Sequence, residues 1–268
     1  MRPAIFDGRL AAARLPGPYL RGLIKILRPL HIIPAIDLID GKCVRLTQGD
    51  YDRKTIYNED PLAVAREFEA AGLKRLHVVD LDGARGGGIV NHKVLEKIAG
   101  GTSLHVDWGG GMKSDEDLRI AFEAGATQVT GGTIAVKRPE VFLGWLERFG
   151  AEKIILGTDV RGTKIAVSGW EEASDRELFE FLEDYVAKGV RYTICTDVSK
   201  DGLLQGTARE LYARIRREQP DVHLIASGGV ADTTDLDAMA ALDCFGVIVG
   251  KAIYEGRISL EELVGYQE

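Results

Sequence analysis

The chain repeats itself at about half its length, and this repeat constrains the fold more than any other feature. Each repeated position follows a short apolar run, at the point where that run gives way to a turn. The repeated pairs are Gly110 with Gly229, Gly132 with Gly250, and Asp37 with Asp159, at spacings of 119, 118 and 122 residues. In a chain of 268 residues this period indicates two related halves.

Short β-branched runs alternate with longer amphipathic stretches from His31 to the end of the chain. The predicted strands are 31–37, 75–80, 104–108, 128–130, 153–158, 191–196, 222–226 and 246–249. The predicted helices are 61–71, 91–99, 115–124, 139–149, 175–188, 208–218, 233–241 and 260–266. Helix starts are marked by Asp60 before Pro61 and by the capping-box pairs Ser114/Asp117, Ser174/Glu177 and Ser259/Glu262.

Eight successive β-then-α units fit either a closed barrel or an open doubly wound sheet. No G-x-G-x-x-G follows the first predicted strand, which weakens the dinucleotide-binding form of the open sheet. Two related halves of four units each close an eight-stranded barrel. We therefore expect an α/β fold, a (β/α)8 TIM barrel built from two repeated (β/α)4 halves.

Residues 1–30 stand outside this alternation. They contain four prolines and carry a net charge of +5, whereas the rest of the chain carries −12. They resemble neither a secretory signal nor a transit peptide. Two explanations stay open, an extension that results from a mis-assigned start and a genuine basic arm. We expect residues 31–268 to form a single TIM-barrel catalytic domain.

Composition excludes several classes of partner. The overall charge of −7 disfavours nucleic acid, and no apolar run approaches the roughly 18–20 residues that cross a bilayer. Cys43, Cys195 and Cys244 lack C-x-x-C spacing, which is typical of a reducing compartment and predicts a cytoplasmic protein. The five histidines show no ligand spacing, and most interrupt apolar runs, which indicates packing roles. We therefore expect neither a metal nor a cofactor.

Some predicted strands are followed by glycines and the others by carboxylates. Barrels carry their catalytic and binding residues at these carboxyl ends of the strands. Glycine-rich turns expose backbone N–H groups that bind anions, although tight turns also need glycine for steric reasons alone. Since four such turns lie at repeat-related positions, we predict two phosphate sites on opposite sides of the barrel mouth. The predicted substrate-binding and phosphate-binding residues are Gly83, Gly110, Gly111, Gly132, Thr133, Trp170, Gly228, Gly229, Gly250 and Lys251.

Asp37 and Asp159 are predicted to face each other between the two phosphate sites. Two carboxylates can act as base and acid if their surroundings separate their pKa values. An aspartate that ends a strand can also simply cap the following turn, but the pairing of these two by the repeat favours catalysis. Trp170 could stack on a flat heterocycle or anchor the core or a lid, and both alternatives stay open.

In combination these residues resemble the family of histidine-pathway isomerases that convert the phosphoribosyl-formimino form of aminoimidazole carboxamide ribotide (ProFAR) to its phosphoribulosyl form. The resemblance runs in order from about residue 31 to the end of the chain. The matching segments are IPAIDL (33–38), GKCVRLTQGDY (41–51), HVVDLDGA (77–84), GGG (109–111), GW (169–170), TDVSKDG (196–202), ASGGV (226–230) and VGKAIYEG (249–256).

The resemblance implies a duplicated half-barrel that performs an Amadori rearrangement. It implies that Asp37 is the general base, Asp159 the general acid, Trp170 the stacking residue, and Thr196 and Asp201 supporting residues after the sixth strand. The implied partner is a small molecule with two phosphates, and the implied reaction needs no cofactor because hydrogen moves as a proton. We expect the protein to be a monomer.

Three features depart from the family pattern. Met112-Lys113 follows the glycine triplet where a hydrophobe and an arginine are common, so a positive charge is kept without the fork geometry of a guanidinium. Trp108 precedes the triplet where a smaller residue is usual. The loop 85–91 is unusually rich in glycine, which suggests a mobile lid.

Three alternatives to the isomerase remain. The sister cyclase subunit that makes imidazole glycerol phosphate shares the duplicated barrel, but it carries cysteine and leucine before its first aspartate, where this chain has Ala35 and Ile36. A dual-substrate isomerase that also accepts phosphoribosylanthranilate is compatible with the sequence. A non-catalytic phosphate-binding barrel would be favoured by the loss of either aspartate, and both are present.

Overall fold

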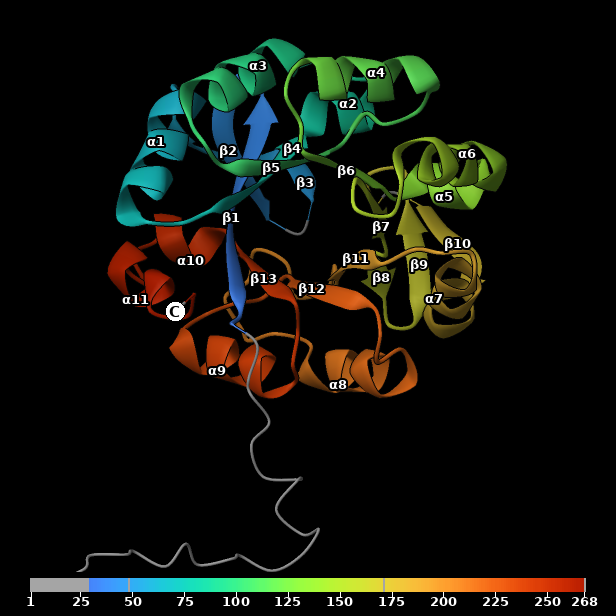
Figure 1. The fold of residues 1–268 in the computed structure, drawn as a ribbon. Helices are drawn as coiled ribbons and strands as arrows, with labels where there is room; N and C mark the ends of the chain where they lie inside the picture. The colour runs from blue at the N-terminus through green and yellow to red at the C-terminus, as the bar shows by residue number, and fades with distance from the viewer. Residues whose placement is uncertain (1–28, 48, 171, 268) are drawn as a thin grey trace, which may run out of the picture.

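Eight parallel strands pair in chain order and close on themselves (Figure 1). The closing ladder joins the first strand to the last, with His31 opposite Gly246 and Pro34 opposite Val249. The barrel strands are β1 (His31–Ile39), β4 (Arg75–Asp80), β5 (His105–Gly109), β6 (Gln128–Gly131), β7 (Ile154–Gly157), β11 (Tyr192–Thr196), β12 (His223–Ser227) and β13 (Gly246–Val249). The closed sheet confirms the predicted (β/α)8 barrel and excludes the open doubly wound sheet.

The computed structural model describes residues 29–47, 49–170 and 172–267, with Thr47 described by its backbone alone. The predicted extension lies almost wholly outside these residues. Leu30 is described and is buried in the core, directly before the first barrel strand begins at His31.

Each barrel strand is followed by one of eight outer helices, and together these helices form the outer ring in Figure 1. They are α1 (Pro61–Ala71), α3 (His92–Gly101), α4 (Asp115–Glu123), α6 (Pro139–Phe149), α7 (Leu178–Ala187), α8 (Arg209–Glu218), α9 (Thr233–Ala241) and α11 (Leu260–Val264). Asp60 caps α1 as predicted, and Ser259 and Glu262 form the predicted capping box of α11. Ser114 caps α4, but the predicted capping box is incomplete, because Asp117 accepts from the Ser114 hydroxyl and from the N–H of Lys113. In the part of the chain that is described, no helix has the length and apolarity needed to cross a membrane.

The predicted capping box at Ser174 and Glu177 is wrong. Both residues lie in strand β10 (Glu172–Glu177), and the Ser174 hydroxyl donates to the carbonyl of Ile165 at 2.9 Å. Pairing of β10 with β9 (Lys164–Val167) therefore overrides the local helix signal, and α7 begins only at Leu178.

Several short elements were not predicted, and all of them follow the carboxyl end of a barrel strand. A hairpin of β2 (Lys42–Thr47) and β3 (Asp50–Asn58) extends β1. A separate three-stranded sheet of β8 (Val160–Arg161), β9 and β10 follows β7. Short helices α2 (Leu81–Arg85), α5 (Thr133–Lys137) and α10 (Lys251–Tyr254) follow β4, β6 and β13. These additions surround the mouth of the barrel.

The alternation of side chains along each strand connects the core to the mouth. Ala35, Ile194, Ile225 and Ile248 pack together in one buried cluster. Two residues farther along the same strands or their extensions lie Asp37, Thr196, Ser227 and Gly250, which line a cavity. Because strand residues i and i+2 point to the same side, a layer of aliphatic side chains forms the floor beneath these polar residues.

Candidate active site

A cavity of about 230 Å³ lies at the carboxyl ends of the barrel strands. All eight strands or the turns directly after them contribute to its lining. The predicted residues that line it are Asp37, Gly110, Gly111, Gly132, Thr133, Asp159, Trp170, Thr196, Asp201, Gly228, Gly229, Gly250 and Lys251. The structure therefore brings these predicted residues together around one cavity.

Gly83 is the predicted residue that the structure places elsewhere. It lies within α2, where it is buried, and its N–H donates to the Asp80 carboxylate at 2.9 Å. A Cβ at this position would approach Asp80 Oδ2 to 2.8 Å and the carbonyl of Gly88 to 2.9 Å. The structure therefore supports a packing role for Gly83 rather than a contact with a ligand.

Asp37 is paired with a cation that the sequence analysis did not single out. Arg45, on β2, donates to Asp37 Oδ2 at 2.6 Å, and the two side chains are only 14% and 12% exposed. A Cβ built on Gly250 would overlap the Arg45 guanidinium. Arg45 therefore lies between the Asp37 carboxylate and one of the glycine turns, where it can contact both a reacting group and an anion.

Asp159 is held by two neutral donors. Trp170 Nε1 donates to Asp159 Oδ2 at 2.8 Å, and Thr196 on β11 adds a second side-chain hydrogen bond. Burial raises the pKa of Asp159 above its usual value, although these two hydrogen bonds and the nearby His77 oppose the rise. A raised pKa suits a carboxyl group that must donate a proton.

A strained turn directs Trp170 over the mouth of the barrel. Ser168, Gly169 and Trp170 all have left-handed backbone conformations, with φ values of 57°, 65° and 72°. A Cβ on Gly49 would come within 2.7 Å of the indole ring, so the ring lies against the backbone of the loop after β2. Ser168 and Trp170 have this conformation although neither is glycine, and it costs free energy. Contacts with the surrounding residues must therefore maintain this turn.

Asp201 adds a third carboxyl group to the cavity. Burial raises the pKa of Asp201 to about 6 against the opposing charge of Arg45, and the carboxylates of Asp37 and Asp159 add to the rise. A group with this pKa exchanges protons near neutral pH.

His77 was predicted to have a packing role, but it lines the cavity. Its Nδ1 lies 2.5 Å from Asp107 Oδ2, and Thr130 donates to Asp107 Oδ1 at 2.8 Å. This buried network fixes the imidazole ring on the floor near Asp159. His77 could have been identified from its position on β4, because it lies two residues before Val79 and so points to the same side of the strand, into the barrel.

The glycine turns at the mouth have matching conformations in the two halves. Gly110 and Gly111 have φ values of 82° and 72°, and Gly228 and Gly229 have 91° and 83°. Gly111 packs on Gly88, and Gly229 packs in the same way on Gly206. The structural register therefore pairs Gly111 with Gly229 at 118 residues, and the predicted pairing of Gly110 with Gly229 is wrong by one position.

Thr133 and Lys251 directly follow the turn glycines Gly132 and Gly250, but each already has a hydrogen-bond partner within the protein. Lys251 Nζ donates to the carbonyl of Gly202 at 3.0 Å, and the Thr133 hydroxyl accepts from the N–H of Ser168 at 2.9 Å. Lys251 keeps two further ammonium hydrogens, and Thr133 keeps its hydroxyl hydrogen, for a ligand.

The three departures from the family pattern each have a structural explanation. Lys113 Nζ donates to the carbonyls of Ala84 and Gly86, which fastens the glycine-rich loop to the glycine triplet. Trp108 is fully buried in the main hydrophobic cluster. The loop 85–91 is fixed by hydrogen bonds from several of its backbone N–H groups to Asp80 and Asp117, and the structure does not support the expected lid.

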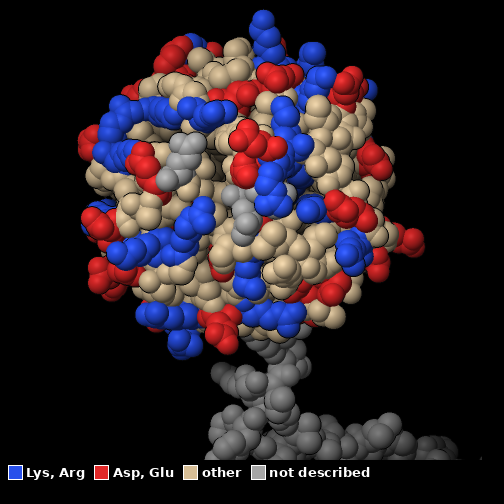
Figure 2. All heavy atoms as spheres, turned by 180° about the vertical axis from the view of Figure 1, so that it is seen from behind, with Lys and Arg blue, Asp and Glu red and all other residues tan. Residues whose placement is uncertain are grey.

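The face shown in Figure 2 carries acidic and basic side chains interspersed with one another. No single sign of charge dominates this face, so local geometry must select an anion in the absence of a broad basic field.

A closed barrel with carboxyl groups and glycine turns gathered at one mouth defines the class of (β/α)8-barrel enzymes, whose active sites lie at this end. The model of the family described as histidine biosynthesis protein matches residues 31–259, and the chain belongs to this family.

The alignments of this chain with two named relatives cover almost the whole length of each relative. A protein of Bacteroides thetaiotaomicron is 60% identical over 234 residues, which are 87% of this chain and 98% of the relative. A protein of Flavobacterium johnsoniae is 58% identical over 237 residues, 88% and 99% of the two chains. Both are named 1-(5-phosphoribosyl)-5-((5-phosphoribosylamino)methylideneamino) imidazole-4-carboxamide isomerase.

Proposed function

We propose that this chain isomerises the aminoaldose ProFAR to the corresponding aminoketose by an Amadori rearrangement in histidine biosynthesis. The relatives named as this isomerase support it over the cyclase and over a non-catalytic barrel. The observation that carries the proposal is that Asp37 and Asp159 line one cavity, between two pairs of glycine turns. Two phosphates bound at these turns would hold the aminosugar across both carboxyl groups.

The two carboxyl groups would act in sequence. Asp159 donates a proton to the ribose ring oxygen, the bond from C1 to this oxygen breaks, and the nitrogen lone pair forms a C1=N Schiff base. Asp37 then takes the proton from C2, and the electron pair of that C–H bond forms the C1=C2 bond of an enaminol. Loss of the C2 hydroxyl proton and protonation of C1 give the ketose. Hydrogen moves only as a proton, so the reaction is balanced without an oxidant.

The surrounding residues have separate tasks in this mechanism. Arg45 orients the Asp37 carboxylate through its ion pair. Thr196 and the Trp170 N–H orient the Asp159 carboxyl group, and the indole face is available for stacking on the imidazole ring of the substrate. Asp201, with its pKa near 6, can exchange protons with the enaminol oxygen.

The direct test is to incubate the purified protein with ProFAR and to follow formation of the phosphoribulosyl product spectrophotometrically, with and without the cyclase partner. Product formation without the cyclase, and consumption of the product when the cyclase and ammonia are added, is the expected result. Cyclisation by this chain alone would instead support the sister subunit.

We expect Trp170→Phe to move the alkaline limb of the kcat profile to higher pH. The indole N–H lowers the pKa of Asp159, so its loss raises that pKa and keeps the acid form present to higher pH. Trp145→Phe is the control, because Trp145 donates its N–H to the exposed Asp115. An unchanged limb in Trp170→Phe would show that Asp159 is not the acid.

We expect activity to survive dialysis against a strong chelator. The described residues contain no group of three His, Cys, Asp or Glu side chains that could hold a metal ion, and the proposed steps need none. Turnover is measured before and after dialysis. Activity that is lost and then restored by a divalent cation would contradict the mechanism.

We further propose that the barrel acts as a monomer in the cytoplasm and that residues 31–268 form a single TIM-barrel catalytic domain. All eight β/α units lie between His31 and Val264, and residues from all eight strands or the turns directly after them line the cavity. The three buried cysteines have thiol pKa values raised by burial to about 12, which fits inert thiols of a reducing compartment.

A further inference from the structure

Asp117 connects two segments of the first half that meet at the mouth of the barrel. It lies in the first turn of α4, is only 8% exposed, and is absent from the cavity lining. Its Oδ1 accepts from the N–H of Ile89 at 2.9 Å, and its Oδ2 accepts from the N–H of Lys113 at 3.2 Å. One carboxylate therefore fastens the loop after β4 to the turn that carries Gly111.

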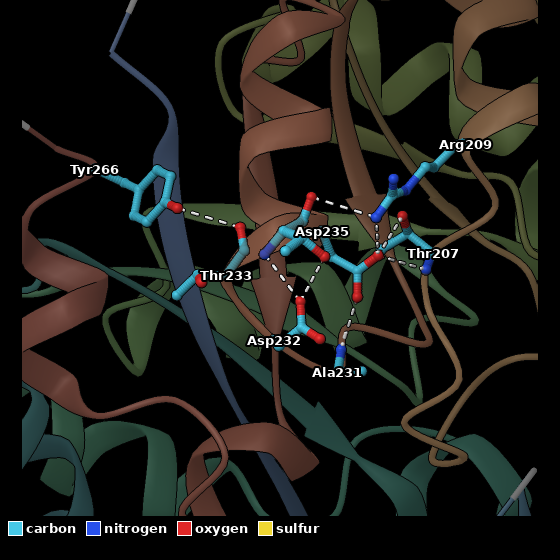
Figure 3. Close-up of polar contacts among 8 residues, drawn as sticks. Thr207, Arg209, Ala231, Asp232, Thr233, Asp235 and Tyr266 are labelled. Carbon is cyan, nitrogen blue, oxygen red and sulfur yellow. Dashed lines mark hydrogen bonds and ion pairs between the residues drawn. The ribbon is translucent and has the colours of Figure 1, made fainter.

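Asp235 makes the same connection in the second half (Figure 3). It lies in the first turn of α9 and is 2% exposed. Its Oδ1 accepts from the N–H of Thr207 at 3.2 Å, and its Oδ2 accepts from the N–H of Ala231 at 2.9 Å. Thr207 and Arg209 lie on one side of the carboxylate in Figure 3, with Ala231 on the other.

The two arrangements are related residue by residue. Asp117 and Asp235, Ile89 and Thr207, and Lys113 and Ala231 are each 118 residues apart. The same spacing relates Gly88 to Gly206 and Gly111 to Gly229, the glycines that pack on each other in each half. The residues whose N–H groups donate are of different types in the two halves. In both halves, however, an aspartate carboxylate accepts at the corresponding two positions.

An ordinary helix cap does not explain this geometry. Glu262 occupies the same third position of helix α11, and it completes a capping box by accepting from the N–H of its own cap residue, Ser259. The backbone N–H groups that donate to Asp117 and Asp235 instead belong to the loop and the turn that precede their helices, and Asp117 Oδ2 also accepts from the hydroxyl of its cap residue Ser114. At Asp235 burial opposes ionisation, but the N–H of Ala231 and Arg209 lower its pKa, so this carboxylate stays charged at neutral pH.

We propose that Asp117 and Asp235 are positioning residues that each hold one glycine turn in its anion-binding geometry, and that each thereby sets the affinity for one of the two substrate phosphates. This inference rests on the proposed function for the identity of the substrate. Neither carboxylate touches the cavity, so each acts through the turn that it fastens. The two turns lie in different halves, and the hydrogen-bond partners of Asp117 differ from those of Asp235. The effects of the two aspartates on phosphate affinity are therefore independent.

The experiment compares Asp117→Asn, Asp235→Asn and the double variant with the parent protein. Asparagine keeps the shape and one acceptor, but it presents an NH2 group to one of the two N–H donors, so one connection is lost. We expect each single variant to raise KM for ProFAR about tenfold and to leave kcat within about twofold, since a hydrogen bond to a charged group is replaced. The double variant should raise KM by the product of the two effects.

A second measurement does not depend on turnover. Inorganic phosphate is titrated into each protein by calorimetry, and the parent should bind phosphate at two sites. Each single variant should weaken one of the two binding events and leave the other unchanged. If the parent shows no turnover of ProFAR, the proposed function fails, and this titration still decides the role of the two aspartates.

Glu262→Gln is the control, because it alters the matching helix position without a connection to a glycine turn. It should leave KM and phosphate affinity unchanged. The inference is overturned if the asparagine variants keep the parent KM and phosphate affinity, if kcat falls while KM does not change, or if Glu262→Gln has the same effects. Should an asparagine variant not fold, Asp→Glu at that position, which keeps the charge and moves the carboxylate, should give the same rise in KM.

Discussion

Replacement of Asp37 or of Asp159 by asparagine lowers kcat by about 10²-fold or more, because an amide cannot exchange a proton at neutral pH and general acid or base catalysis typically contributes ~10²–10⁴-fold. Asparagine preserves the size of the side chain. At Asp159 it can still accept from Trp170, and at Asp37 it can still accept from Arg45. We therefore expect the cavity to keep its shape in both variants.

The KM values should change little, since the glycine turns bind the phosphates independently of the carboxyl groups. Asp184→Asn, on the outer face of α7, removes the same charge far from the cavity and should behave as the parent. Steady-state kinetics with ProFAR give both constants. If either asparagine variant kept near-full turnover, that carboxylate would be a turn former and the acid–base pair would be an accident of the repeat.

Gly229→Ala raises KM by about 10–100-fold, with a much smaller effect on kcat. A Cβ at Gly229 would collide with the carbonyl oxygen of Gly206, and the φ of 83° disfavours any side chain. The turn must therefore move away from its anion-binding position. Loss of one hydrogen bond to a charged phosphate costs about 1.5–3 kcal/mol, which corresponds to this range in affinity.

Gly189→Ala separates backbone strain from loss of binding. Gly189 follows α7 with a φ of 100°, and a Cβ there would meet nothing within 4 Å. Both variants should lose about 1–2 kcal/mol of stability from the left-handed conformation, so both should melt at lower temperature. An equal rise in KM for the two would mean that the effect at Gly229 is general destabilisation.

The repeat and the alternation of apolar runs were sufficient to predict the barrel. All eight barrel strands and all eight outer helices lie where the sequence places them, to within a few residues at each end. The hairpin β2–β3 was not predicted because β3 is almost wholly exposed and so has no buried face to produce an alternating pattern. Strand β10 was mistaken for a helix start for the same reason, since its exposed polar residues satisfied a short capping motif.

Those residues of the candidate site that are recognisable by residue type and by their place after a strand could be predicted from the sequence. Glycines and aspartates at strand ends are visible in any barrel of this kind, and the structure brings nearly all of them around one cavity. Arg45 was not predicted, because its place depends on the register of β2 against β1, where Asp37 lies opposite Val44. Asp117 and Asp235 were not recognised because their sequence context is that of helix caps, and only the contacts distinguish them.

Proton transfer from C2 of the aminosugar tests the central claim most directly. ProFAR labelled with deuterium at C2 of the reacting ribose is incubated with the purified protein, and the product is examined by proton NMR. The account predicts formation of the phosphoribulosyl ketose with loss of the C2 deuterium in the parent protein, and no conversion above background in the Asp37→Asn, Asp159→Asn double variant. Recovery of unchanged substrate from the parent protein, or conversion by the double variant at the parent rate, would contradict it.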